Sequence, residues 1–231
     1  MGNSEKGFGL TNNQLKLIAM LSMLIDHVGM LLFPDVRVLR IIGRLAFPIF
    51  AFMIAEGCAH TRSRRDYFLK IAAMALLCQI VYAVAEQSLY QCVLVTFSLS
   101  VLTIFATDRF LLKRDWVSSL LLTGALAAVA VMTLLLPLLL ADTDYGVDYG
   151  FWGVLLPVAV YYLPRKRDKL LAAAMILTLL GLTVGGRQWY GLLAVPLLAL
   201  YNGRRGKWKL KYGFYIFYPA HLALLHLISL L

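Results

Sequence analysis

Charged residues are scarce in this sequence. Asp, Glu, Lys and Arg together make up 15% of the 231 residues, and 61% of the residues are hydrophobic. A soluble globular domain carries about 25% charged residues and about 45–50% apolar ones. This composition cannot cover a water-facing surface, which excludes an ordinary soluble domain. It predicts instead a protein whose surface faces mostly lipid.

Patterns for metal, disulfide and nucleotide binding are also lacking. The three cysteines, Cys58, Cys78 and Cys92, include no C-x-x-C pair, and an odd number cannot all be paired. We interpret them as small apolar residues within helices. No glycine-rich nucleotide loop occurs, and nothing in the sequence requires a metal ion.

Acidic residues are few relative to basic ones. The 12 Asp and Glu residues stand against 22 Lys and Arg, which gives a net charge of +10. A basic protein often binds nucleic acid, but here the bases lie in short connections between apolar segments. Such connections are rich in Lys and Arg on the cytoplasmic side of a membrane. We therefore attribute the charge to topology and expect no nucleic-acid partner. An anionic ligand at the cytoplasmic face would use the same side chains.

Long apolar segments are what the sequence does contain. A membrane-crossing helix needs about 20 predominantly apolar residues. The candidate segments lie near residues 15–33, 41–59, 67–86, 93–110, 116–140, 151–163, 170–184, 189–201 and 212–231. Two of them, 151–163 and 189–201, have only 13 residues and contain Pro157 and Pro196. These two are candidates for broken or buried segments, which are tolerated only away from lipid.

Basic connections alternate along the chain. The bases gather around residues 62–65, 109–114, 165–169 and 204–211, and the connections between them hold few bases. If both short segments cross, the positive-inside rule places the N-terminus inside and the C-terminus outside. The sequence thus predicts one all-α domain over residues 1–231. It is a polytopic integral membrane helical bundle with about nine transmembrane helices.

The first apolar segment carries ionisable residues on one face. His27 follows Lys16 by eleven residues, which puts both on one helix face and about 16 Å apart along the axis. One interpretation is a snorkelling lysine and a buried packing histidine. The other is a channel with an anion-binding mouth and a base deep inside. Asp26 is turned about 100° from His27, so we expect it to pair with another helix.

The second apolar segment brings two arginines and a glutamate. Arg40 and Arg44 are one helical turn apart on one face. Arg44 lies near the depth of His27, while Glu56 lies near the depth of Lys16. Pro48 should loosen the helix between them. One interpretation is two ion pairs, Arg44–Asp26 and Lys16–Glu56. The other keeps Arg44 as a binder of an oxyanion or carboxylate beside His27.

The last segment concentrates aromatic and imidazole side chains. Tyr215, Tyr218 and His221 are spaced three residues apart, on adjoining helix faces. A single membrane histidine often serves packing through a hydrogen bond. A cluster of tyrosines and histidines in one apolar helix favours a lined cavity.

A histidine deep in the membrane, aligned with a cytoplasmic cation, suggests acyl transfer across the bilayer. The donor would be an anionic cytosolic thioester, for which coenzyme A is the obvious candidate, with its phosphates held by Lys and Arg. His27 would take the proton of an amine or hydroxyl that arrives from outside. Arg44 would stabilise the oxyanion of the tetrahedral intermediate.

Four stretches resemble the TraX family of membrane proteins, whose namesake is linked to N-terminal acetylation of conjugative pilin. They are LKLIAMLSMLIDHVGMLLFP, LRIIGRLAFPIFAFMIAEGCAHTRSRRDYFLK, the DYG of the acidic loop and KYGFYIFYPAHL. The family is similar to the wider membrane acyltransferase-3 group, whose first helix carries a basic residue, ten residues and a histidine. Lys16 and His27 reproduce that spacing, with Lys in place of the more usual Arg. The resemblance implies a catalytic role for His27, an acetyl-CoA donor and an extracytoplasmic acceptor.

The sequence therefore predicts a multi-pass acetyltransferase of the bacterial cytoplasmic (inner) membrane. Its acceptor is a pilin-like peptide, a glycan or a lipid. We expect catalysis by His27, Asp26 and Arg44, a substrate pocket formed by Arg40, Glu56, Tyr218 and His221, and coenzyme A binding by Lys16, Arg62, Arg64, Arg65 and Lys211. Two rival hypotheses are a small-solute or proton-coupled transporter and a non-catalytic assembly factor for a surface polymer. Against a transporter, the two halves show no inverted repeat.

Overall fold

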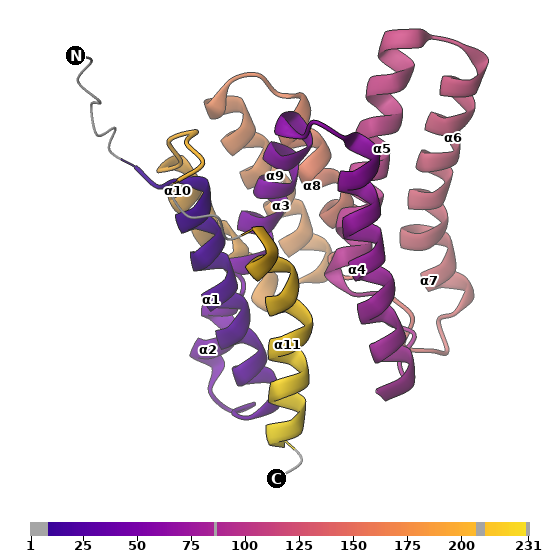
Figure 1. Cartoon of the computed structure of the whole chain (residues 1–231). Coiled ribbons are helices and arrows are strands. Elements are labelled where there is room, and N and C mark those ends of the chain that lie inside the picture. Colours follow the sequence, from indigo (N-terminus) through magenta and orange to yellow (C-terminus); the bar gives the residue numbers. More distant parts are fainter. Residues whose placement is uncertain (1–8, 86, 207–210, 230–231) are drawn as a thin grey trace, which may run out of the picture. The chain divides into compact units, whose positions relative to one another are not determined.

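The computed structural model describes residues 9–85, 87–206 and 211–229, and the regular elements in these ranges are helices (Figure 1). The all-α prediction is therefore confirmed. The chain divides into two compact units, one formed by Met1–Met53 with Gly181–Leu231 and the other by Ile54–Leu180. The prediction of a single domain over the whole chain stays a prediction.

Several helices have the length and composition of membrane spans. Among the described residues, five stretches qualify: Asn12–Leu31, Arg37–His60, Arg64–Val84, Val93–Lys113 and Trp116–Leu139. Two shorter apolar helices occupy Gly150–Tyr162 and Phe217–Ile228. Large apolar side chains on these helices are exposed, Leu76 at 64% and Leu138 at 77% for example, as expected of a surface that faces lipid. The chain is a multi-pass membrane protein, while the number of crossings and their orientation stay predictions.

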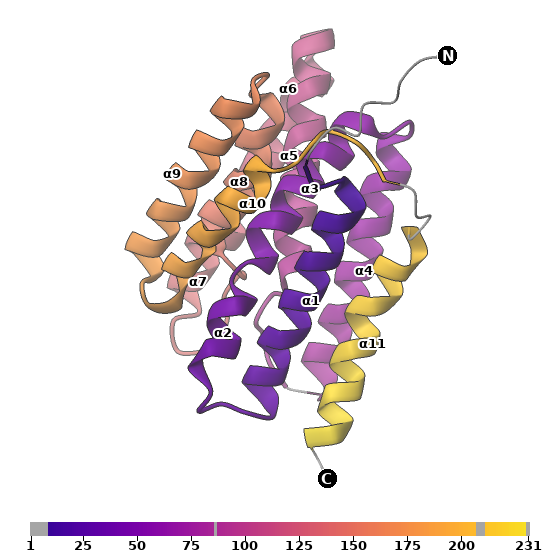
Figure 2. The same cartoon turned by 90° about the vertical axis from the view of Figure 1, so that its left-hand side faces the viewer.

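The first unit is built around α1 (Asn12–Leu31). Both α2 (Arg37–Gly43) and α11 (Lys211–Ser229) pack against α1, and Figures 1 and 2 show them running along it. The unit also holds the 3₁₀ helix η2 (Gly186–Leu193) and α10 (Ala194–Ala199). It shares α3 (Ala46–His60) and α9 (Lys166–Val184) with the second unit. Two of its helices far apart in sequence, α1 and α11, are therefore neighbours.

The start of α1 is held by two sets of hydrogen bonds. Thr11 forms a capping box with Gln14, and the backbone N–H of Gln14 donates to the Thr11 hydroxyl. The N–H groups of Asn12 and Asn13 donate to the carbonyls of Arg204 and Arg205, at 2.8 and 3.2 Å. The first backbone donors of a helix need such partners, because no turn precedes them. This end of α1 is therefore anchored to the basic loop after α10.

The predicted continuous helix 41–59 is interrupted. After α2 ends at Gly43, Arg44 and Leu45 form a turn, and α3 begins at Ala46. Pro48 explains the position of the break. It has no N–H to donate to the carbonyl of Arg44, four residues earlier, and its ring would clash with that carbonyl. Loosening near Pro48 was expected from the sequence, whereas a full break into two helices was not.

The second unit packs around α5 (Val93–Lys113). Its neighbours are α4 (Arg64–Ala85), α6 (Trp116–Ala130) and α8 (Gly150–Tyr162). A buried cluster of Leu99, Val129 and Val154 lies where α5, α6 and α8 meet. The short helix α8 has Val154, Leu156 and Val160 at most 2% exposed, which agrees with the expectation of a buried short segment.

Two predicted helices that contain a proline are irregular. The segment 116–140 passes from α6 through a π-helical turn, η1 (Val131–Leu135), into α7 (Leu136–Leu139). Pro137 follows this turn and has no N–H for the preceding carbonyls. The segment 189–201 begins in the 3₁₀ helix η2, which ends at Leu193, and continues as the six-residue α-helix α10, Ala194–Ala199. It is thus the broken segment that its length and Pro196 suggested.

Candidate active site

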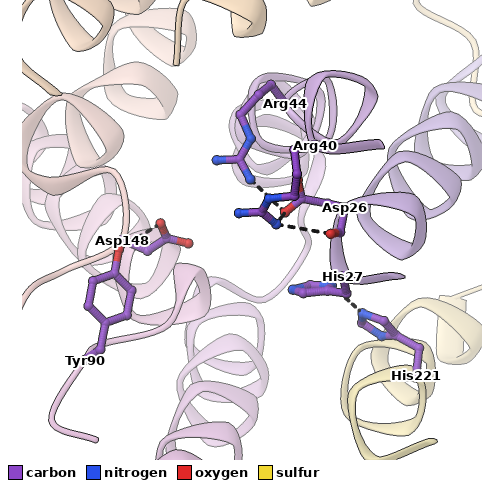
Figure 3. Close-up of polar contacts among 7 residues, drawn as sticks. All are labelled: Asp26, His27, Arg40, Arg44, Tyr90, Asp148 and His221. Carbon is purple, nitrogen blue, oxygen red and sulfur yellow. Dashed lines mark hydrogen bonds and ion pairs between the residues drawn. The ribbon is translucent and has the colours of Figure 1, made fainter. Parts of the chain in front are cut away.

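A carboxylate bound by two arginines lies between α1 and α2. Oδ2 of Asp26 lies 2.6 Å from Nη1 of Arg40 and 2.7 Å from Nη2 of Arg44. Nη1 of Arg40 also donates to the backbone carbonyl of Asp26 at 3.1 Å. All three side chains are at most 14% exposed. The arginines are one turn apart on the sequence, which lets both reach the same oxygen (Figure 3).

The two carboxylate oxygens of Asp26 have different surroundings. Oδ2 accepts both guanidinium groups, whereas Oδ1 is buried and has no hydrogen-bond partner among the described residues. The carboxylate packs against Gly43, where an added Cβ would overlap it. The cluster combines one negative and two positive charges. Its net positive charge is suited to an anionic group or a developing oxyanion.

Two histidines meet between α1 and α11. Nε2 of His221 lies 2.9 Å from Nδ1 of His27, and their ring centroids are 4.9 Å apart. Nδ1 of His221 lies 2.7 Å from the carbonyl oxygen of Phe217, one turn earlier in α11. The Phe217 ring stacks on His221 at 4.6 Å, and the Tyr218 ring meets it edge-on at 5.9 Å. His221 is buried, 5% exposed, so this ring is fixed from three sides.

The two clusters are linked through α1. Asp26 and His27 are consecutive residues, and Figure 3 shows the carboxylate directed to the arginines while the imidazole faces His221. Asp26, Arg40 and Arg44 all interact electrostatically with His27. As the helix geometry predicted, Asp26 does not orient its neighbour's ring but pairs with another helix. The unit therefore places an imidazole beside a buried cationic group.

The remaining predicted site residues fall into two groups. In the first unit, Lys16 is half-buried on α1 and interacts electrostatically with Arg205, Tyr218 is buried beside His221, and the side chain of Lys211 lies outside the described residues. In the second unit, Arg62 and Arg65 are exposed. The predicted pair Lys16–Glu56 joins residues of different units and stays a prediction.

Glu56 and Arg64 have partners that sequence reasoning missed. Nζ of Lys169 lies 3.0 Å from Oε1 of Glu56. Nη2 of Arg64 lies 2.7 Å from Oδ2 of Asp108. The Tyr161 hydroxyl donates to the same oxygen, and the Tyr162 hydroxyl donates to Oδ1. An acidic residue near the end of an apolar helix was a signal that could have identified Asp108. Glu56 and Arg64 thus take part in ion pairs within the second unit.

The acidic loop before α8 is held by hydrogen bonds within the second unit. The Tyr90 hydroxyl donates to Oδ1 of Asp148 at 3.2 Å (Figure 3), and the Leu89 N–H donates to Oδ1 of Asp144 at 3.0 Å. Hydrogen bonds from the Ser88 side chain and the Leu89 N–H lower the pKa of the Asp144 carboxyl. These two carboxylates help to fix the loop against the segment that precedes α5.

Comparison with known proteins agrees with the resemblance found in the sequence. The TraX protein family matches residues 11–229 of this chain. The chain belongs to the TraX family. The match spans both units of this TraX protein and includes every predicted site residue.

Relatives of the TraX chain were found among curated proteins. It is 30% identical to a "Probable fimbrial assembly protein FimC, serogroup H1" of Dichelobacter nodosus, over 92% of this chain and 93% of that protein. A stretch of 44 residues is 50% identical to an uncharacterized protein of Rickettsia prowazekii (strain Madrid E) and covers 18% of each chain. No solved structure matches the chain.

Proposed function

We propose that this TraX-family protein is a membrane-bound acetyltransferase. It transfers an acetyl group from cytosolic acetyl-CoA to an amine or hydroxyl at the extracytoplasmic side. The observation that carries the proposal is His27, an imidazole hydrogen-bonded to His221 and adjacent to the Asp26–Arg40–Arg44 cluster. Family membership supports the reaction class, because the family is associated with pilin acetylation.

In the proposed reaction, His27 is the general base. It takes the proton of the acceptor N–H or O–H while the acceptor atom forms a bond to the thioester carbon. Arg40 and Arg44 stabilise the negative charge that develops on the thioester oxygen. The C–S bond then breaks, and the imidazolium returns the proton to the leaving thiolate. The products are the acetylated acceptor and free coenzyme A, so atoms and charges balance.

Asp26 supports the reaction by holding both arginines. A guanidinium that must reorganise during the reaction loses part of its stabilising effect, whereas a preorganised one does not. Asp26 fixes Arg40 and Arg44 through one oxygen while leaving the cluster with net positive charge. We also propose Tyr218 and His221 of the first unit as substrate-binding residues. Glu56 of the second unit is a further proposed substrate-binding residue.

The phosphates of coenzyme A require cations on the cytoplasmic side. We propose Lys16, Arg62, Arg64, Arg65 and Lys211 for this role. Arg62 and Arg65 are the stronger candidates of the second unit, because Arg64 already pairs with Asp108 at 2.7 Å. In the first unit, the N–H groups at the start of α1 already donate to the carbonyls of Arg204 and Arg205 and to the Thr11 hydroxyl, so they are not available to a phosphate. Lys16 would therefore bind an anion through its ammonium group.

The proposed orientation follows from the charge pattern. We propose about nine crossings of a bacterial inner membrane, with the N-terminus inside, the C-terminus outside and residues 1–231 acting as one catalytic domain. The acceptor then arrives from outside. A pilin-like peptide is the first candidate, because the Dichelobacter nodosus relative is described as a probable fimbrial assembly protein. A glycan or lipid acceptor fits the same chemistry.

The decisive experiment measures acetyl transfer. Protein purified into nanodiscs is incubated with radiolabelled acetyl-CoA and an envelope extract of the host, and labelled products are separated. We expect a labelled product with the wild type and none above background with His27→Ala. His60→Asn, at an exposed histidine of α3, is the matched control and should retain activity. Absence of both coenzyme A binding and labelled product with the wild type would refute the proposed acetyltransferase activity.

The rival hypotheses predict other outcomes in the same preparation. A transporter would show gradient-driven uptake into vesicles without a covalent product. A non-catalytic assembly factor would support surface-polymer assembly in cells even with His27→Ala. Acetyl transfer that depends on His27 contradicts both.

A further inference from the structure

The hydrogen bonds around His221 determine where its proton sits. A carbonyl oxygen accepts hydrogen bonds and cannot donate them. Nδ1 of His221, 2.7 Å from the carbonyl oxygen of Phe217, must therefore carry a hydrogen. A lone pair on Nδ1 at that distance would face the lone pairs of the oxygen and repel them. His221 is thus protonated on Nδ1.

The proton on His221 determines the proton on His27. A neutral imidazole has one N–H and one acceptor nitrogen. Because Nδ1 of His221 carries the hydrogen, its Nε2 is an acceptor. Nδ1 of His27, 2.9 Å away, must then be the donor. The lone pair of neutral His27 is left on Nε2, the nitrogen that points away from this hydrogen bond.

A cationic His221 would carry a hydrogen on both nitrogens, so its Nε2 would donate to His27 instead of accepting from it. The surroundings of His221 oppose that charge. The ring is 5% exposed and stacked on Phe217, with Tyr218 against its edge. Burial of an unpaired charge is costly. The one carboxylate beside His27 in the sequence, Asp26, is already bound by Arg40 and Arg44. A neutral His221 is therefore the state that the contacts support.

We infer that His221 is a positioning residue that holds His27 in its Nδ1–H tautomer, so that Nε2 of His27 is the atom that takes the acceptor's proton. The inference rests on the proposed acetyl transfer. The tautomer of a histidine is set by the hydrogen bond of its other nitrogen. Here Nδ1 of His27 donates to Nε2 of His221, and Nδ1 of His221 donates to the main-chain carbonyl of Phe217 in α11. Because that carbonyl can only accept, it fixes the direction of both hydrogen bonds.

A neutral partner gives the base a particular property. When Nε2 of His27 gains the acceptor's proton, Nδ1–H still donates to Nε2 of His221, whose lone pair stabilises the imidazolium. A carboxylate partner would stabilise that cation more strongly. With His221 in this place, the imidazolium releases its proton more readily to the leaving thiolate as the C–S bond breaks. The pair thus serves both proton transfers of one turnover.

The first test observes the tautomer directly and needs no activity. Protein with ¹⁵N-labelled histidine in nanodiscs is studied by NMR at a pH where the histidines are neutral. Assignment of the His27 signals comes from comparison with His27→Ala. We expect Nδ1 of His27 to be the protonated nitrogen. Protonation on Nε2 would overturn the inference, whatever the acetyl-transfer assay gives.

The second test uses three substitutions of His221. In His221→Gln the side-chain oxygen can occupy the position of the imidazole Nε2 and accept from His27. His221→Asn is one bond too short to do so, and His221→Phe keeps a ring without an acceptor. We expect His221→Gln to retain the His27 tautomer and most of kcat. We expect the other two to mix the tautomers and to lower kcat about 10²–10⁴-fold, the usual contribution of a general base, with KM for acetyl-CoA nearly unchanged.

The pattern of variants separates positioning from folding. A merely structural role would lower thermal stability and activity together, and Gln would fare no better than Asn. Equal kcat in Gln, Asn and Phe variants would overturn the inference while leaving acetyl transfer intact. Absence of both coenzyme A binding and acetyl transfer with the wild type would refute the proposed function, yet the NMR result would still decide the tautomer.

Discussion

Gly43 leaves the space that the carboxylate of Asp26 occupies. An added Cβ at Gly43 would overlap Cβ, Cγ and Oδ1 of Asp26. We therefore expect Gly43→Ala to displace the carboxylate from Arg40 and Arg44. Overpacking of this kind destabilises a protein by about 1–3 kcal/mol, and acetyl transfer should fall as the arginines lose their fixed position. Thermal unfolding in nanodiscs and the labelled-acetyl assay measure the two effects.

The control for this prediction is Gly124→Ala in α6. An added Cβ at Gly124 meets nothing within 4 Å, and alanine favours a helix over glycine by about 0.5–1 kcal/mol. This variant should be neutral or slightly more stable, with unchanged activity. Equal stability of Gly43→Ala and the wild type would contradict the close contact.

The shared carboxylate predicts a strong effect of Asp26→Asn. This change removes the negative charge that the largely buried Arg40 and Arg44 both bind, and removal of one partner of a buried pair costs about 3–5 kcal/mol. We expect a large loss of stability in Asp26→Asn. The double variant with Arg44→Gln should recover part of it, because one of the two buried cations is removed together with the carboxylate. A double variant whose loss equals the sum of the single losses would show that the pair is not coupled.

Much of the fold could be predicted from hydropathy, because long apolar runs bounded by charge set the ends of a membrane helix. The structure has Asn12–Leu31 and Val93–Lys113 as candidate spans close to the predicted segments 15–33 and 93–110. Local irregularities within the helices were harder to predict from the sequence. Pro48 indicated a weak point, whereas the π turn before Pro137 was not predicted. Whether a proline breaks a helix or shifts it into a π turn depends on the packing around the freed carbonyls.

The site was predictable where one helix supplies the pattern and unpredictable where two distant helices meet. Periodicity placed Arg40 and Arg44 together, and charge suggested the Arg44–Asp26 pair. That Arg40 would share the same oxygen of Asp26 was not predicted. The bond between His27 and His221 joins residues 194 positions apart, and a single sequence holds no signal for that distance. Lys169 as partner of Glu56 was missed for the same reason.

Coenzyme A binding should depend on the exposed arginines at the start of α4 more than on Arg64. We expect Arg65→Glu to raise the Kd for coenzyme A about tenfold, because it replaces attraction to the phosphates by repulsion. Arg64→Gln should act more weakly on binding, since Arg64 is already paired with Asp108. Thermal shift measures Kd, because stabilisation grows as RT ln(1 + [L]/Kd).

The control for binding is Arg187→Glu. Arg187 is exposed in η2, and the predicted topology places it on the side away from the cytosol. Its replacement should leave the Kd unchanged. The effect of Arg65→Glu should also shrink in high salt, because exposed charges are screened. A loss of affinity equal in Arg65→Glu and Arg187→Glu would contradict the proposed cytoplasmic site for the phosphates.

The acidic loop should loosen in acid. Hydrogen bonds from the Ser88 side chain and the Leu89 N–H lower the pKa of Asp144 in the folded protein, below the value of about 3.9 for an unfolded chain. A lowered carboxyl pKa means that the contribution to stability is fully present above the unfolded pKa. It is lost as pH falls through the folded pKa.

Hydrogen exchange at the Leu89 amide measures this contribution, since Leu89 donates to Asp144 at 3.0 Å. We expect protection to be constant from neutral pH down to about pH 5 and then to fall, after correction for the intrinsic exchange rate, as the carboxylate is protonated. Asp144→Asn should show, at every pH, the weaker protection that the wild type reaches only in acid, because an amide oxygen accepts less strongly than a carboxylate. Asp142→Asn, in the same exposed turn, is the matched control and should follow the wild type. Protection that instead rises as pH falls would mean that the loop is held by a group other than the ionised Asp144.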